Sequence, residues 1–94
     1  MNTSMTIDEI LNRIEEICRQ MNVGHLYLFG SYAAGDYTNM SDIDIYVKEC
    51  KDMTVLREKL EQIPTLKKID LINYDSCKNK FLIEEMDKYG KQIY

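Results

Sequence analysis

The pattern of apolar and polar positions along the chain predicts alternating helical and extended segments. Residues 7–21 carry apolar side chains at helical intervals, which predicts an amphipathic first helix. Thr6 and Glu9 have the spacing of a capping box, so this helix is expected to begin directly after Thr6. The apolar positions are Ile7, Ile10, Leu11, Ile14, Ile17, Cys18 and Met21.

Two further helices are predicted in the second half of the chain. Asp52 is a suitable N-cap for a helix with an apolar face, and Pro64 marks its end. Ser76 is expected to cap a last helix that continues through Tyr89, with Gly90 as its stop.

Short apolar runs between the helices predict strands at residues 26–29, 42–48 and 67–74, and a short final strand at residues 92–94. The first of these runs leads into a short helix that ends at Gly35. Helices therefore alternate with strands. This order predicts an α/β (α+β) fold, with a small mixed β-sheet flanked by helices in a single domain over residues 1–94.

The candidate catalytic and binding residues lie where the first strand ends and the second begins. The apolar strand stops at Gly30 and Ser31, where backbone N–H groups at a strand-to-helix turn can hold a phosphate. Asp42 and Asp44 are two residues apart at the start of the next strand, so both carboxylates are expected on one face. Neighbouring carboxylates raise one pKa or hold a cation, and hard oxygen ligands favour Mg²⁺ or Mn²⁺. A phosphate cradle beside such a cation site predicts phosphoryl or nucleotidyl transfer.

Asp70 is a lone acid within the apolar run at residues 67–74. It could occupy an exposed strand position, or it could join Asp42 and Asp44 as a third carboxylate. The residue pattern by itself does not distinguish these two interpretations.

Composition and charge narrow the range of functions. The net charge is -4 and the pI is about 4.9, so direct binding to nucleic acid is not expected. No apolar run approaches the roughly 20 residues that span a bilayer, and residues 1–6 lack the basic and apolar regions of a signal peptide. Cys18, Cys50 and Cys77 are too widely spaced for a zinc motif and are expected to be reduced thiols. A cytoplasmic location without membrane association is therefore predicted.

The motif Gly30-Ser31, ten intervening residues and Asp42-x-Asp44 resembles the signature of the DNA polymerase beta-like nucleotidyltransferases. The whole chain is similar to the minimal nucleotidyltransferase subgroup, which is typically encoded beside a HEPN-domain partner in toxin-antitoxin pairs. This resemblance implies a polymerase beta-like fold. It also favours Asp70 as the third acid, because these enzymes carry one on a neighbouring strand.

The resemblance implies an antitoxin that transfers AMP from ATP to a tyrosine hydroxyl of a HEPN-domain RNase toxin and so neutralises it. Asp42 and Asp44 would hold a metal that grips the triphosphate, and Asp70 would complete a second metal site and help to deprotonate the hydroxyl. Gly30 and Ser31 would hold the outer phosphates. Two Mg²⁺ ions are implied as cofactors, with Mn²⁺ as the alternative.

The sequence departs from the family pattern at one position. The turn often reads Gly-Ser-x-Ala-Arg-Gly, and here Ala34 stands at the arginine position. Lys67 and Lys68 are candidates to replace the missing cation, although both could simply be solvated. The rival interpretation from another class is a non-catalytic antitoxin that masks its toxin by binding alone.

Overall fold

The computed structural model describes residues 5–94 of the chain. Residues 1–4 lie outside this range, and with them most of the N-terminal segment, residues 1–6, in which no signal peptide is predicted. In chain order the elements are α1 (Ile7–Gln20), β1 (His25–Phe29), α2 (Gly30–Ala34), β2 (Ile43–Lys48), α3 (Met53–Glu61), β3 (Ile69–Asn73), the 3₁₀ turn η1 (Tyr74–Ser76), α4 (Lys80–Tyr89) and β4 (Lys91–Gln92). The predicted order of helices and strands is confirmed.

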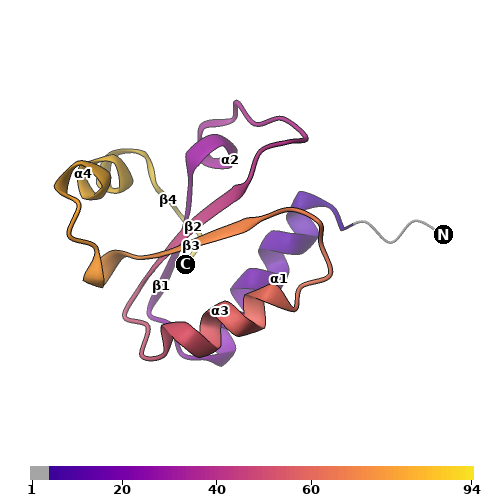
Figure 1. Cartoon of the computed structure of the whole chain (residues 1–94), viewed down its shortest axis with the longest axis horizontal. Helices are drawn as coiled ribbons and strands as arrows, with labels where there is room; N and C mark the ends of the chain where they lie inside the picture. Colours follow the sequence, from indigo (N-terminus) through magenta and orange to yellow (C-terminus); the bar gives the residue numbers. More distant parts are fainter. Residues whose placement is uncertain (1–4) are drawn as a thin grey trace.

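The strands form one mixed sheet in the order β3-β2-β1-β4. β1 is antiparallel to both β2 and β4, whereas β2 and β3 are parallel. Parallel neighbours need a crossover connection, and α3 provides it between β2 and β3. Figure 1 shows α1 and α3 together on one side of the sheet, with α2 and α4 on the other side.

The main core lies between the sheet and the pair α1 and α3. Side chains alternate along β2, so Ile43, Ile45 and Val47 are fully buried toward these helices. Ile10 and Ile14 of α1 are also fully buried in this core. The alternate residues of β2, beginning with Asp44, are thereby directed to the opposite face of the sheet.

Two helix starts form as the local sequence predicts. The Glu9 amide donates to Thr6 Oγ1, and the Thr6 amide donates to Glu9 Oε1, which completes the capping box of α1. The Asp52 carboxylate accepts a hydrogen bond from the Val55 amide at the start of α3.

The predicted start of the last helix is wrong, because Asn79 and not Ser76 caps α4. Ser76 instead lies in the turn η1, which is held by two neighbouring contacts. The Asn73 side chain accepts from the Asp75 amide, and the Asp75 carboxylate accepts from the Glu49 amide at 2.7 Å. These bonds tie the segment to the end of β2 and delay the helix.

The strand ends also differ from those predicted. The second and third strands are shorter, at Ile43–Lys48 and Ile69–Asn73, and the final strand is Lys91–Gln92. Asp42 consequently lies one residue ahead of the first paired residue of its strand. The pairing of β2 with β3 begins at Ile43, whose amide donates to the Lys68 carbonyl.

Tyr46 fixes α4 on the outer face of the sheet. Its hydroxyl is buried and donates to the Met86 carbonyl at 2.9 Å, and its ring stacks on Tyr27 with centroids 4.6 Å apart. A side chain at Gly90 would overlap the Tyr46 hydroxyl, so glycine is required at the end of α4. Tyr74 adds a second link through a hydrogen bond to Asp87.

No helix within residues 5–94 is both long enough and apolar enough to cross a bilayer.

Candidate active site

Asp44 and Asp70 lie opposite each other on the neighbouring parallel strands β2 and β3. Both project from the face of the sheet that α1 and α3 do not cover, because Ile43, Ile45 and their strand neighbours occupy the covered face. Asp44 is half-buried, and 38% of the Asp70 side chain is exposed. The parallel register therefore makes a carboxylate pair from acids that are 26 positions apart in the chain.

The environment of Asp44 disfavours its ionised form. Burial, a hydrogen bond with Asp70 and the charges of Asp70 and Asp42 together raise the pKa of Asp44 to about 6, from an ordinary value of 3.8. The Lys68 ammonium acts in the opposite direction. A carboxyl with this pKa is mostly ionised at neutral pH, and a bound cation would keep it ionised at lower pH.

Gly30 brings the main chain directly against the Asp44 carboxylate. Its φ of +67° lies in the left-handed region, and a Cβ at this position would overlap Asp44 Oδ2. The sequence therefore needs glycine here for both conformation and space. The same close approach places the start of α2, including Ser31, beside the carboxylate pair.

Asp42 is exposed and is less closely associated with the pair. Its charge contributes to the raised pKa of Asp44, but less than burial and Asp70 do. Over the described range 5–94, no three acidic, histidine or cysteine side chains converge closely enough to form a metal-binding group. Asp42, Asp44 and Asp70 therefore share one region of the sheet without forming a preformed three-ligand site.

The donor set nevertheless fits a hard divalent cation. Asp44 and Asp70 offer only carboxylate oxygens as ligands. Their negative charges repel each other, and a bound Mg²⁺ or Mn²⁺ would offset this repulsion. Asp42 could join them by a side-chain rotation, since it is exposed and lies one residue before β2. These three residues would hold the metal.

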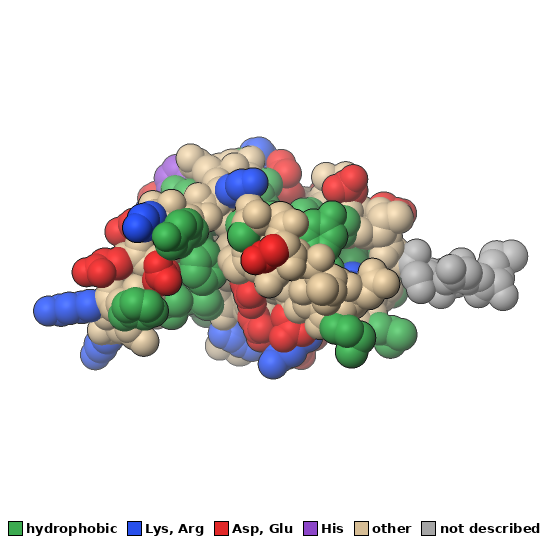
Figure 2. Space-filling view, turned by 90° about the horizontal axis from the view of Figure 1, so that it is seen from above, with side chains coloured by type: hydrophobic (Ala, Val, Ile, Leu, Met, Phe, Trp, Pro, Cys, Tyr) green, Lys and Arg blue, Asp and Glu red, His purple; other side chains and the backbone are tan. Residues whose placement is uncertain are grey.

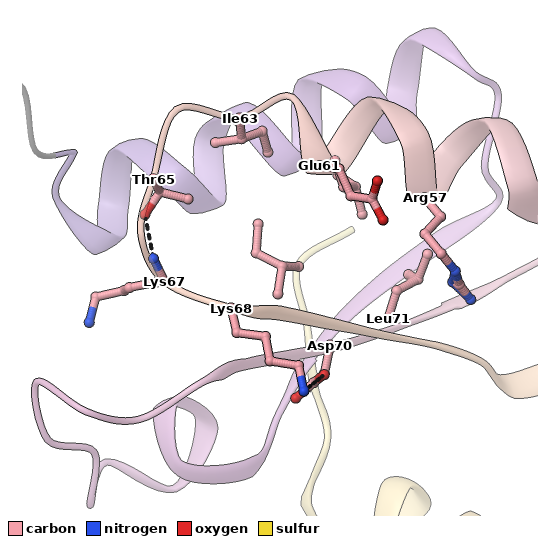
Figure 3. A pocket seen from close by; sticks show the side chains of 10 residues that line it. Arg57, Glu61, Ile63, Thr65, Lys67, Lys68, Asp70 and Leu71 are labelled. Carbon is pink, nitrogen blue, oxygen red and sulfur yellow. Dashed lines mark hydrogen bonds and ion pairs between the residues drawn. The ribbon is translucent and has the colours of Figure 1, made fainter.

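A cavity of about 510 Å³ opens beside Asp70, between α3 and β3. Figure 3 shows Arg57 and Glu61 reaching into it from α3, and the Lys68 side chain lying along β3 toward Asp70. The Lys68 ammonium is 3.5 Å from Asp70 Oδ1. Lys68 thus partly neutralises the carboxylate pair in the structure.

A second cavity, of about 630 Å³, lies between α2 and α4. Gly30, Ser31 and Ala34 line it from one side, and Lys88 and Lys91 line it from the other. In Figure 2 acidic side chains gather in a hollow between the surface over α2 and the surface over α4. No motif in the sequence indicates that α4 reaches this site, because its approach depends on the tertiary contact between Tyr46 and Met86.

The pKa of Asp44 predicts how the stability of the metal-free protein depends on pH. The folded state holds this proton more tightly than the unfolded state does, so the stabilisation is present below pH 3.8 and is lost as the pH rises through about 6. The shift corresponds to at most about 3 kcal/mol, and solvent screening of this half-buried group reduces it to about 1 kcal/mol. We expect Asp44→Asn to melt about 5 °C above wild type at about pH 7.5 and close to wild type near pH 4.

Thermal denaturation in a chelating buffer measures this difference. Adding Mg²⁺ at neutral pH should then raise the melting temperature of wild type and leave that of Asp44→Asn unchanged, since only wild type can bind the ion. A constant difference between the two proteins across the pH range would contradict the assignment of the raised pKa to Asp44.

Comparison with known proteins agrees with this geometry. A family model described as "Polymerase beta, Nucleotidyltransferase" matches residues 12–94. A Methanocaldococcus jannaschii protein, provisionally named a protein adenylyltransferase, is 36% identical over 96 aligned positions, and the alignment covers 94% of this chain and 95% of that protein. A second protein of the same organism and provisional name is 34% identical over 92 residues, with 88% and 98% covered.

Solved structures show the same fold. The crystal structure of a toxin-antitoxin with AMP-PNP matches with a TM-score of 0.71 at 30% identity, covering 88% of this chain and 71% of that one. A mutant of the toxin-antitoxin MntA-HpeT matches with a TM-score of 0.69 at 31% identity, covering 89% and 71%. The sheet, the paired aspartates and these similarities together show that the chain belongs to the polymerase beta nucleotidyltransferase family.

Proposed function

We propose that this nucleotidyltransferase is an antitoxin that transfers AMP from ATP to a tyrosine hydroxyl of a cognate HEPN-domain toxin. The observation that carries the proposal is the pair Asp44 and Asp70, held on adjacent strands against the backbone of Gly30. The protein adenylyltransferase names of the relatives support the reaction class. The toxin-antitoxin structures, one of them with AMP-PNP, support a toxin partner and ATP.

In the proposed reaction the acceptor oxygen forms a bond to the α-phosphorus of ATP, and the bond from that phosphorus to the bridging oxygen breaks. Pyrophosphate leaves, and the hydroxyl proton passes to a carboxylate. Asp70 is the group placed for this proton, since 38% of its side chain is exposed and it lies opposite Asp44 on the face of the sheet that α1 and α3 leave uncovered. Asp42 and Asp44 would hold the Mg²⁺ that grips the triphosphate, and Gly30 and Ser31 would hold its outer phosphates.

Bound Mg²⁺ would neutralise phosphate charge and polarise the α-phosphate. The chain supplies the carboxylates for one or two such ions, with Mn²⁺ as the alternative. Lys68 must share or release Asp70 when a cation binds, because its ammonium lies 3.5 Å from Asp70 Oδ1. Until a cation binds, the Lys68 ammonium partly neutralises the charge of Asp44 and Asp70.

The competing proposal is an antitoxin that masks its toxin by contact alone. It is favoured by the lack of a preformed three-ligand metal group within residues 5–94. The raised pKa of Asp44 argues against it, because an uncompensated carboxylate pair costs stability in a protein that only binds. We place either activity in the cytoplasm, which the three free thiols Cys18, Cys50 and Cys77 support, and we expect no direct role for nucleic acid.

Intact mass spectrometry distinguishes these proposals. The protein is incubated with ATP and Mg²⁺, with and without the product of the neighbouring gene, and in parallel as Asp42→Ala/Asp44→Ala. We expect the neighbour to gain one or more AMP units with the wild-type protein and none with the double variant. A stable complex with an unmodified neighbour would instead establish masking by contact.

A further inference from the structure

β3 forms one edge of the sheet, and its outer side has no partner strand. Within residues 5–94 the strand order β3-β2-β1-β4 pairs β3 with β2 alone. The strand at the opposite edge, β4, has 2 residues, whereas β3 has 5. In Figure 1 β3 lies in the foreground, in front of β2. β3 is therefore the longer of the two edges at which a further strand can pair.

The parallel register determines which backbone groups of β3 point outward. The Ile43 amide donates to the Lys68 carbonyl, and this bond sets the phase of the ladder between β2 and β3. Because alternate residues of a parallel strand bond to the same neighbour, Asp70 and Ile72 direct their amides and carbonyls toward β2. The residues on either side of them direct their amides outward. These outward residues are Ile69, Leu71 and Asn73.

The outward backbone groups lack other partners. Among residues 5–94, no backbone–backbone hydrogen bond outside the ladder with β2 engages Ile69 or Leu71. Their alternating amides and carbonyls are the groups that an added strand would pair with. The edge thus has the hydrogen-bonding pattern that an extended chain matches.

A strand added at this edge would face the acids on one side and a cavity on the other. In Figure 3 Asp70 and Leu71 point to opposite sides of the β3 ribbon, with Leu71 directed toward α3. The cavity of about 510 Å³ lies on the α3 side of β3, and its apolar lining consists of Leu60, Ile63, Ile69 and Leu71. Since side chains alternate along a strand, consecutive residues of an added strand would project onto the face with the acids and into this cavity in turn.

The mouth of the cavity carries polar groups. Arg57 and Glu61 reach into it from α3, and both are exposed. Neither takes part in the ion pairs found within the described part of the chain. A side chain that enters the cavity would therefore meet an apolar floor and a rim with both a hydrogen-bond donor and an acceptor.

Two kinds of chain could supply the added strand, namely a second copy of this protein or the acceptor protein. Two β3 edges paired antiparallel over their whole length would place Leu71 opposite Leu71, with the two Asp70 carboxylates close together on one face. That arrangement adds a further negative charge beside Asp44, whose ionised form is already disfavoured by Asp70. The acceptor, by contrast, must bring a hydroxyl group to Asp70 in the proposed reaction. The edge therefore suits the acceptor better than a second copy.

We propose that the acceptor tyrosine lies on an extended segment of the partner protein that pairs with the outer edge of β3. The tyrosine projects onto the face that carries Asp44 and Asp70. The residues directly before and after it are apolar, and they project into the cavity between α3 and β3. This inference rests on the proposed function and states how the acceptor chain is bound. Main-chain hydrogen bonds supply affinity in such a mode, and the cavity supplies preference for the flanking residues.

Amide hydrogen exchange, measured residue by residue by NMR, tests this mode of binding without turnover. In the protein alone the three outward amides should exchange at least about tenfold faster than those of Asp70 and Ile72, which bond to β2. Saturation with the product of the neighbouring gene, in the absence of ATP, should slow the outward amides about tenfold or more. The amides of Asp70 and Ile72 are the internal control and should change little.

The same measurement has two outcomes against the inference. A complex in which the outward amides exchange as fast as in the protein alone would overturn it, while transfer of AMP to the neighbour would still support the proposed function. Slowing that increases with the concentration of this protein alone would show that a second copy occupies the edge. A neighbour that neither binds nor gains AMP would overturn both proposals.

A pair of variants tests the edge during turnover. Leu71→Pro removes one outward amide and leaves the ladder with β2 intact, since proline is tolerated where a strand amide faces away from its neighbour. Leu71→Ala is the matched control, because it also loses the leucine side chain but keeps the amide. Leu71→Pro should raise the KM for the neighbour about tenfold above that of Leu71→Ala, with the same affinity for a non-hydrolysable ATP analogue. Equal KM values for the two folded variants would contradict pairing at this edge, and hydrogen exchange in the wild-type protein decides the question if Leu71→Pro does not fold.

Discussion

Asp44→Asn is expected to lower the rate of AMP transfer by about a thousandfold while the protein remains folded. The substitution keeps the shape of the side chain but removes the negative charge that would attract the cation. Asp44 is also the acid nearest to the Gly30 backbone, so no neighbouring residue can take over its position. The variant should fold normally, because the neutral amide avoids the charge repulsion that raises the pKa of the wild-type carboxyl.

Transfer is measured by intact mass of the partner at increasing Mg²⁺ concentration, and folding by circular dichroism. Asp8→Asn is a suitable control, since Asp8 is an exposed acid in the first turn of α1, on the other side of the sheet from the carboxylate pair. It changes the net charge equally and should retain wild-type activity. Transfer by Asp44→Asn within tenfold of wild type would exclude Asp44 as a metal ligand.

Gly30→Ala is expected to lower transfer about a hundredfold and to destabilise the protein by about 1–2 kcal/mol or more. Two effects combine at this position. The left-handed φ of +67° strains any residue with a Cβ, and that Cβ would also overlap Asp44 Oδ2. The carboxylate must move to relieve the overlap, and a displacement of about 1 Å is enough to disrupt catalysis.

Gly35→Ala separates the two effects. Gly35 has a similar φ of +86°, but a Cβ there meets no atom within 4 Å. It should therefore show the cost of backbone strain as a lower melting temperature, with transfer close to wild type. Equal activity of Gly30→Ala and Gly35→Ala at matched stability would show that the close approach of Gly30 to Asp44 has no role in catalysis.

Local signals in the sequence predict the helices that begin with strong caps. Thr6 with Glu9 and Asp52 with the Val55 amide both form as expected, because such hydrogen bonds join residues only three positions apart. The start of α4 is mispredicted since Ser76 and Asn79 are both acceptable caps. A hydrogen bond from the distant Glu49 amide to Asp75 decides between them.

Some residues of the candidate site are likewise predicted by local sequence, and others are not. The spacing of Gly30, Ser31, Asp42 and Asp44 is visible in the sequence because these residues serve one short strand-turn-strand unit. Whether Asp70 joins them could not be decided from the residue pattern. The parallel register of β2 and β3 places it opposite Asp44, although the catalytic roles of all these residues remain predictions.

The sequence by itself determined the type and order of the elements, the buried faces of α1 and β2, and the glycine turn beside the aspartates. These follow from periodicity and capping, which act within a few residues. Only the tertiary structure decided the strand order, the pairing of Asp44 with Asp70, and the cavity that α2 and α4 form between them. Such contacts join segments far apart in the chain, and they depend on how the whole sheet and its helices pack together.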